Sequence, residues 1–154
     1  MKPKAILVDL DDTVARKTTR HHYCWHRLDE DEPILPVLSL VRNCPYKIII
    51  LTARNEGYPA TNKTRAKFPD WTDEEIETIG RKLTTQWVWL HVGDVEKIIM
   101  KPAKSFEKSS VFKLDEYRKL CDSYDIEAII DDNEHVCKAF KEETDIQVIQ
   151  IYGP

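Results

Sequence analysis

Four short apolar segments limit what this chain can fold into. Residues 5–10 (AILVDL), 47–53 (KIIILTA), 127–131 (EAIID) and 146–151 (IQVIQI) are almost continuously apolar, and a weaker segment, KIIM, spans residues 97–100. A strand with one face in water alternates apolar and polar residues, whereas these segments do not, so each is expected to be buried on both faces. They predict a parallel sheet with helices on both sides.

Helical patterns lie between the expected strands. The clearest is residues 72–91, where Thr72 and Glu75 fit a capping box. Apolar residues then recur at steps of three or four and predict a buried stripe made of Ile76, Ile79, Leu83, Trp87 and Leu90.

Shorter helices are expected to begin at Pro33, with Leu35 on the buried face, at Ser109 or Ser110, and at Asn133. Strands that alternate with helices predict the α/β class: a three-layer, doubly wound, mostly parallel sheet.

Residues 1–154 are expected to form a single domain of this kind. Residues 16–32 and 54–71 show no clear periodicity, and each directly follows a strand. They are interpreted as small loop insertions beside the crevice at the carboxyl ends of the strands, with no large cap.

Charge and cysteine usage narrow the class of protein. The formal net charge of −4 argues against broad adhesion to nucleic acid or membranes, although it leaves room for a local basic groove. The four cysteines form no CxxC pair, which favours reduced thiols and a cytoplasmic location. No apolar run approaches the ~20 residues that a membrane span needs, and no membrane partner is expected.

Acidic residues stand where the first apolar segment stops. Asp9, Asp11 and Asp12 follow it within the stretch AILVDLDDT. Side chains two residues apart on an extended chain project to the same side, so Asp9 and Asp11 are expected to face one small volume. Carboxylates this close repel each other unless a cation lies between them or one takes a proton.

Other strand ends carry complementary chemistry. Thr52 and Arg54 end the second segment, Asp131 and Asp132 end the fourth, and Lys113 lies near the start of the helix before it. Each motif alone has an ordinary reading, as a helix-capping loop, a turn or a solvated lysine. Together they supply a nucleophile, an acid–base group, Mg²⁺ ligands and phosphate-binding groups, which phosphoryl transfer needs.

The motifs DLDDT, LTAR, the lysine of SSVFKLDEY, and IIDDN resemble those of the haloacid dehalogenase (HAD) superfamily of phosphotransferases over the whole chain. Flanking stretches, including WHRLDEDEPILPVLSLV and IIMKPAKSFEKSSVFK, resemble the 3′-phosphatase domain of phage-type polynucleotide kinase/phosphatase. No GxxxxGK[ST] phosphate loop occurs, so a kinase half is not expected in this chain.

The resemblance implies a role for each matching residue. Asp9 would attack phosphorus, and Asp11 would protonate the leaving oxygen and then deprotonate water. Thr52 and Lys113 would bind the transferred phosphate. The implied Mg²⁺ ligands are Asp9, the backbone carbonyl of Asp11, and Asp131 or Asp132. No role is implied for Asp12.

Substrate-binding residues are less well defined. Arg54 would contact phosphate or order its loop. Lys101, Ser105 and Lys108 stand where the family often has arginine or aspartate, and lysine lacks the bidentate fork of arginine. The lysines between residues 97 and 113 are either a solvated face or a track for a nucleic-acid backbone.

Aromatic and histidine residues lie in the two insertions. Tyr23, Trp25, Tyr58 and Trp71 would either stack on bases or pack the loops. A zinc site built from the histidines of residues 21–26 and Cys24 is disfavoured by its irregular spacing.

The predicted function is therefore a Mg²⁺-dependent polynucleotide 3′-phosphatase that acts in nucleic acid repair on DNA or RNA ends, with a separate kinase or ligase as a partner. One alternative is a small-molecule phosphatase such as a 5′- or 3′-nucleotidase. A second is a non-catalytic module that binds nucleic-acid ends, against which the intact motifs argue.

Overall fold

A computed structural model describes residues 1–153 of the chain. Its main sheet has five strands, all parallel, in the order β5-β4-β1-β6-β7. These are β1 (Lys4–Val8), β4 (Lys47–Asn55), β5 (Lys97–Lys101), β6 (Asp125–Asp131) and β7 (Gln147–Gln150). All five expected strands are present, and the predicted α/β class is confirmed.

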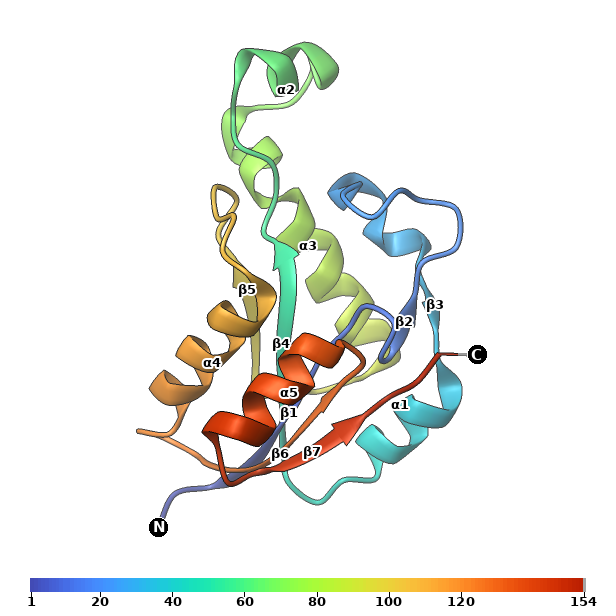
Figure 1. Cartoon of the computed structure of the whole chain (residues 1–154). Helices are drawn as coiled ribbons and strands as arrows, with labels where there is room; N and C mark the ends of the chain where they lie inside the picture. Colours follow the sequence, from blue (N-terminus) through green and yellow to red (C-terminus); the bar gives the residue numbers. More distant parts are fainter. Residues whose placement is uncertain (154) are drawn as a thin grey trace.

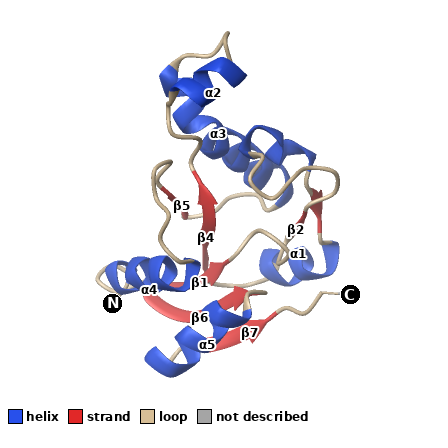
Figure 2. Ribbon diagram, turned by 45° about the horizontal axis from the view of Figure 1, so that its top comes forward, coloured by secondary structure: helices blue, strands red, loops and turns tan. Residues whose placement is uncertain are grey.

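Helices cover both faces of the sheet (Figures 1 and 2). One side carries α1 (Leu35–Arg42) and α3 (Asp73–His91), and the other carries α4 (Ser109–Leu120) and α5 (Glu134–Glu143). No helix within residues 1–153 is long and apolar enough to cross a membrane.

The central strand β1 explains why its sequence does not alternate. Ile6 and Val8 belong to the core beneath α1 and α3, whereas Ala5 and Leu7 belong to the core beneath α4 and α5. Both faces of β1 are therefore buried, which requires a continuous apolar run.

The two insertions contain short elements that the sequence did not predict. The first holds β2 (Ala15–Arg16), the 3₁₀ helix η1 (Trp25–Glu30) and β3 (Glu32–Pro33), and β2 pairs antiparallel with β3. The second holds α2 (Asn62–Lys67), which begins at a capping box formed by Thr61 and Thr64. These elements are too short to give a periodic signal.

Some details of the expected helices are wrong. Pro33 ends β3 instead of opening α1, and Leu35 at the start of α1 is 62% exposed. The capping box at Thr72 is confirmed, but Leu90 is 75% exposed because the buried face of α3 follows Ile76, Gly80, Thr84, Trp87 and Val88.

The start of α4 also differs from the prediction. Lys108 precedes the helix and makes no side-chain cap, so neither Ser109 nor Ser110 is the cap residue. The cap at Asn133 is confirmed, since its side chain accepts a hydrogen bond from the Val136 amide.

Candidate active site

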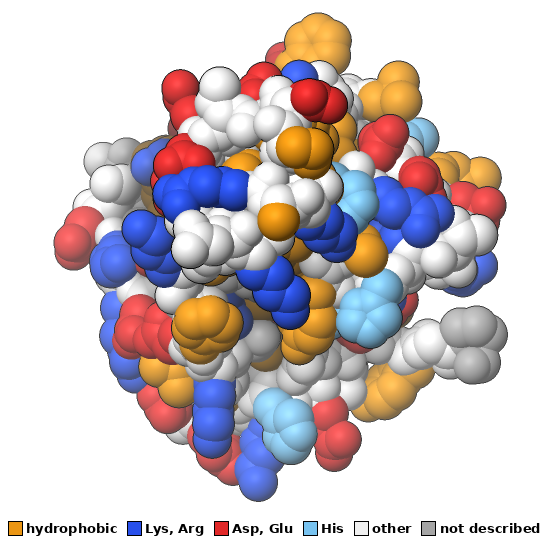
Figure 3. Space-filling view, turned by 90° about the horizontal axis from the view of Figure 1, so that it is seen from above, with side chains coloured by type: hydrophobic (Ala, Val, Ile, Leu, Met, Phe, Trp, Pro, Cys, Tyr) orange, Lys and Arg blue, Asp and Glu red, His pale blue; other side chains and the backbone are white. Residues whose placement is uncertain are grey.

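A cavity of about 240 Å³ opens at the carboxyl ends of β1, β4 and β6. Figure 3 views the molecule from above, the side toward which β4 points; Lys, Arg and His side chains occupy the middle of this face and most acidic ones lie nearer its rim. The residues that line the cavity are Asp9, Asp11, Asp12, His22, Tyr23, Trp25, Ala53, Arg54, Asn55, Lys101, Ser109, Lys113, Asp131, Asp132, Asn133 and Val136.

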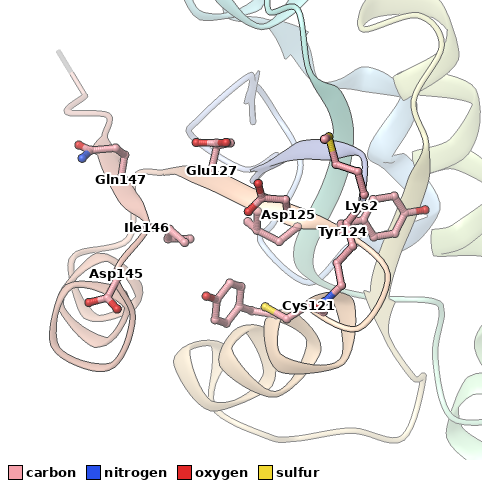
Figure 4. A pocket seen from close by; sticks show the side chains of 11 residues that line it. Lys2, Cys121, Tyr124, Asp125, Glu127, Asp145, Ile146 and Gln147 are labelled. Atoms are coloured by element: carbon pink, nitrogen blue, oxygen red, sulfur yellow. The ribbon is translucent and has the colours of Figure 1, made fainter.

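A larger cavity, of about 640 Å³, lies where β6 begins (Figure 4). Lys2, Tyr124 and Asp125 are among the side chains that line it. None of the predicted catalytic residues lies there, and ligands of open α/β sheets bind at the opposite edge, so the smaller cavity is the candidate site.

Three aspartates and a lysine form what we call the acid-rich cluster. Asp9, Asp131 and Asp132 have carboxylate oxygens within 4.8 Å of one another. Lys113 is fully buried, and its Nζ donates to Asp9 Oδ1 at 2.8 Å and to Asp131 Oδ2 at 2.6 Å. The hydroxyl of Thr13 lies 3.0 Å from Asp9 Oδ2 and 3.3 Å from Asp132 Oδ1.

Burial and mutual repulsion set the charge state of this cluster. Burial and the neighbouring Asp9 raise the pKa of Asp131 to about 6 and the pKa of Asp132 to about 7. Burial by itself would lower the pKa of Lys113, but the attraction of Asp131 and Asp9 outweighs it and raises that pKa. Lys113 is therefore a fixed positive charge beside carboxylates that repel one another.

The acid-rich cluster fits a divalent cation. Mg²⁺ prefers carboxylate oxygens from a few residues, and three carboxylates face a single ammonium group here. The two oxygens of Asp131 already accept hydrogen bonds, from Lys113 and from the Asn133 amide, whereas Asp132 accepts only a long one from Thr13. Both oxygens of Asp9 also accept hydrogen bonds, from Lys113 and from Thr13. Asp132 is thus the carboxylate whose oxygens are freest to bind a cation directly.

Asp11 belongs to a different set of side chains, which we call the arginine–aspartate cluster. Arg54 donates to both oxygens of Asp11, at 3.0 and 2.9 Å, and Arg20 donates at 3.1 Å. Both arginines also bind Asp31, with distances of 2.6 and 2.7 Å from Arg20 and 2.8 Å from Arg54. The negative charges of the two carboxylates are matched by the positive charges of the two guanidinium groups.

The environment of Asp11 keeps it ionised. Burial by itself would raise its pKa, but the charge and hydrogen bonds of Arg54, assisted by Arg20, lower that pKa to about 2.

Asp9 and Asp11 line one cavity, as expected, but their side chains bind different partners. β1 ends at Val8, and Asp11 lies in a turn in which the Thr13, Val14 and Ala15 amides all donate to the Leu10 carbonyl. Asp12 has φ 59°, the left-handed conformation that glycine and aspartate adopt most easily. The turn redirects Asp11, and it gives Asp12 a conformational role.

Side chains of α3 hold the arginine–aspartate cluster in place. Arg54 Nη1 donates to Thr84 Oγ1 at 3.2 Å, and the indole nitrogen of Trp87 donates to the Asp31 carbonyl at 2.8 Å. This long helix therefore connects the core to the site.

The remaining predicted residues lie in different environments. Thr52 is fully buried, its hydroxyl accepts the Arg54 amide, and Ala53 lines the cavity in its place. Lys101 lines the cavity, where burial lowers its pKa and its Nζ donates to the Glu107 carbonyl at 2.5 Å. Lys108 is exposed and does not line the cavity.

The run of lysines before α4 does not form one continuous surface. Lys101 and Lys113 are buried, whereas Lys97, Lys104 and Lys108 are exposed. The aromatic residues also separate: Tyr23 and Trp25 line the cavity, while Tyr58 and Trp71 both stack against Phe68.

Sequence reasoning missed Arg20, Asp31 and Ser109, which the structure places at the site. Arg20 and Asp31 lie in the aperiodic first insertion, where no spacing marks them. Across residues 1–153, the acid-rich cluster is the only group of three or more acids, histidines or cysteines close enough to share an ion, and the histidines near Cys24 are not part of it.

This fold and these side chains define an α/β phosphatase of the HAD type. The chain belongs to the family described as "polynucleotide kinase PNKP phosphatase domain", whose model matches residues 3–153.

Two solved chains are similar in fold. One is a chain of the Pnkp1/Rnl/Hen1 RNA repair complex, with 22% identity, a TM-score of 0.75, and coverage of 99% of this chain and 43% of that chain. The other, from a Pnkp1/Rnl/Hen1 complex, has 22% identity, a TM-score of 0.76, and coverage of 99% and 47%. This chain thus spans less than half the length of either. A comparison with curated proteins gives no match.

Proposed function

We propose that this protein is a Mg²⁺-dependent polynucleotide 3′-phosphatase that works through an aspartyl-phosphate on Asp9. The observation that carries the proposal is the position of Asp9 in the cavity, between Lys113 and Thr13, within a chain of the PNKP phosphatase family. The substrate would be a 3′-phosphate on a DNA or RNA end. The complexes to which the two solved chains belong support a role in RNA repair beside a kinase or ligase partner.

The first chemical step forms the aspartyl-phosphate. A carboxylate oxygen of Asp9 attacks phosphorus, the bond from phosphorus to the sugar oxygen breaks, and Asp11 gives its proton to that oxygen. Lys113 remains charged beside Asp9 and stabilises the phosphoryl oxygens. Mg²⁺, held by Asp9, Asp132 and the Asp11 carbonyl, with Asp131 beside them, would add positive charge at the phosphate.

The second step releases inorganic phosphate. Water attacks phosphorus, Asp11 accepts a proton from the water, and the bond between phosphorus and Asp9 breaks. The two arginines keep Asp11 ionised, which suits this step. For the first step Asp11 must carry a proton, so we expect the incoming phosphate to compete with Asp11 for Arg54, which lines the cavity.

Phosphate release from matched substrates tests the proposal. The set contains DNA and RNA oligonucleotides with a 3′-phosphate, the same oligonucleotides with a 5′-phosphate, and 3′-mononucleotides, each with Mg²⁺ and with EDTA. We expect activity on 3′-phosphorylated ends that EDTA removes and that Asp9→Asn abolishes. A preference for mononucleotides would identify a nucleotidase instead, and full activity of Asp9→Asn would reject the assigned nucleophile.

A further inference from the structure

Tyr23 lies at the candidate site, and its side chain is largely exposed to solvent. It lines the cavity that contains Asp9 and Asp11, yet it is 63% exposed. Among residues 1–153, it is the only exposed large hydrophobic side chain that lines this cavity. Its neighbour Trp25 also lines the cavity but is only 6% exposed. Trp25 anchors the loop, and Tyr23 forms part of its rim.

The ring of Tyr23 has roughly perpendicular aromatic neighbours and is not covered by a stacked aromatic ring. It lies 4.7 Å from the His22 ring at 81° and 5.8 Å from the Trp25 ring at 82°. The rings of Phe68 and Trp71, in contrast, stack at 4.5 Å and 11°. No aromatic ring in the described part of the chain lies parallel to Tyr23, and the residue is largely exposed, which leaves room for a planar ligand to stack on its ring.

The rim is tied to the arginine–aspartate cluster. Arg20 binds Asp11 and Asp31, and its Nη1 also donates to the His22 carbonyl at 3.1 Å. On the other side of Tyr23, the Cys24 amide donates to the His21 carbonyl at 3.0 Å. The backbone that carries Tyr23 is therefore held in a fixed position relative to the acids of the site.

The size of the cavity indicates which part of a substrate reaches Tyr23. Pockets that enclose a whole drug-sized ligand have volumes of about 300–1,000 Å³. A cavity of about 240 Å³ lined mainly by charged and polar groups suits a phosphate with its sugar oxygen. A base attached to that sugar then lies outside the cavity, at the rim.

We propose that Tyr23 forms a nucleobase-binding site on which the base of the phosphate-bearing nucleotide stacks. This inference rests on the proposed function, and it adds the group that recognises a nucleic-acid end rather than a bare phosphate ester. Stacking on an aromatic ring depends little on base identity, so the site accepts all four bases. The end must be frayed or single-stranded, because a base within a duplex stacks on its neighbours.

Kinetics with a base-free end test the proposal. We compare kcat/KM for a 3′-phosphorylated oligonucleotide with kcat/KM for the same oligonucleotide whose terminal nucleotide lacks its base. The wild-type protein should prefer the base-bearing end by roughly 5- to 140-fold, the range expected for one stacking contact. Tyr23→Leu keeps an apolar side chain but removes the π-face, and should bring the base-bearing end down to the abasic level, mainly through KM.

Two variants serve as controls. Tyr23→Phe keeps the ring and should keep the preference. Trp89→Leu removes a ring that is also exposed, at 74%, but lies on α3 and does not line the cavity, so it should leave both substrates unchanged. Equal wild-type activity on both ends, or an equal loss on both in Tyr23→Leu, overturns the base site while leaving the phosphatase proposal standing.

A binding measurement separates stacking from turnover. Asp9→Asn is mixed with an oligonucleotide that carries 2-aminopurine at its 3′-phosphorylated end, because stacking quenches the fluorescence of this base. We expect quenching that the added Tyr23→Leu substitution removes. Quenching that persists in the double variant overturns the base site. Failure of the proposed function would give a different result: the wild-type protein would release phosphate from neither the base-bearing nor the abasic oligonucleotide.

Discussion

Two buried charge clusters meet at the end of β1, and they differ in how their charges balance. The acid-rich cluster sets three carboxylates against one lysine, whereas the arginine–aspartate cluster matches two carboxylates with two guanidinium groups. The first has an excess of negative charge that a cation or a phosphate reaction would use. The second has no excess charge and suits a structural role, because it fixes Asp11 and the backbone beside it that carries Tyr23. Charge balance thus separates the two roles more clearly than residue type does.

The largest expected difference is in activity and concerns Asp9. Asp9→Asn should lower kcat by about 10⁴-fold or more, as removal of a nucleophile does. Its stability should stay the same or rise, because the amide oxygen still accepts from Lys113 and one carboxylate charge is gone. Phosphate release and urea unfolding measure the two effects. A large loss of stability would show that the acid-rich cluster is needed for folding, and the contrast between the clusters would fail.

Asp31→Asn, in contrast to Asp9→Asn, should lower the stability of the protein. Asp31 is fully buried and accepts three hydrogen bonds from Arg20 and Arg54. An amide in its place leaves two buried guanidinium groups with one carboxylate, which should lower the free energy of unfolding by about 3–5 kcal/mol.

The matched control for Asp31 is Asp73→Asn. Asp73 also accepts two hydrogen bonds from an arginine, at 2.9 Å each from Arg65, but this pair is exposed. Urea unfolding should show little or no loss of stability for this variant, because water screens an exposed pair. Equal losses in the two variants would mean that burial does not distinguish the arginine–aspartate cluster.

The positions of the strand ends explain which part of the site could be predicted from the sequence. Runs such as residues 47–53 predict buried parallel strands because both faces must be apolar, and parallel strands bring their carboxyl ends to one edge. Asp9, Asp131 and Asp132 therefore meet as expected, and Lys113 reaches them from the start of α4.

Arg20 and Asp31 show why the rest was not predictable. Their pairing depends on how the first insertion folds over α3, which is set by tertiary contacts such as the bond from Trp87 to the Asp31 carbonyl. The direction of Asp11 depends on a turn that follows the strand, and the two-residue period holds only while the chain is extended.

A third test compares how the two clusters respond to Mg²⁺. A ligand that binds the folded protein at 100 times its Kd stabilises it by about 2.7 kcal/mol. We expect Mg²⁺ to raise the Tm of the wild-type protein and of Asp31→Asn, and to have little effect on Asp132→Asn, which lacks a proposed ligand. Thermal unfolding in Mg²⁺ and in EDTA measures this. An undiminished Mg²⁺ response in Asp132→Asn would place the cation elsewhere.

The smallest expected effect concerns the link between α3 and the arginine–aspartate cluster. Thr84→Val keeps the shape of the side chain but removes the hydroxyl that accepts from Arg54 Nη1, and Thr84 is fully buried. One guanidinium N–H loses its partner, which should lower the free energy of unfolding by about 1 kcal/mol, at the lower end of the range for such a group because the bond is 3.2 Å long.

Thr78→Val is the control on the same helix, since the Thr78 hydroxyl is exposed and donates to the Glu74 carbonyl. It should cost less than Thr84→Val, because water replaces the lost bond. Since the arginine–aspartate cluster fixes Asp11, Thr84→Val should also lower kcat, and Thr78→Val should not. A loss of stability in Thr84→Val with unchanged kcat would show that Arg54 keeps Asp11 in place without the support of α3. The contact between Thr84 and Arg54 would then contribute to stability but not to activity.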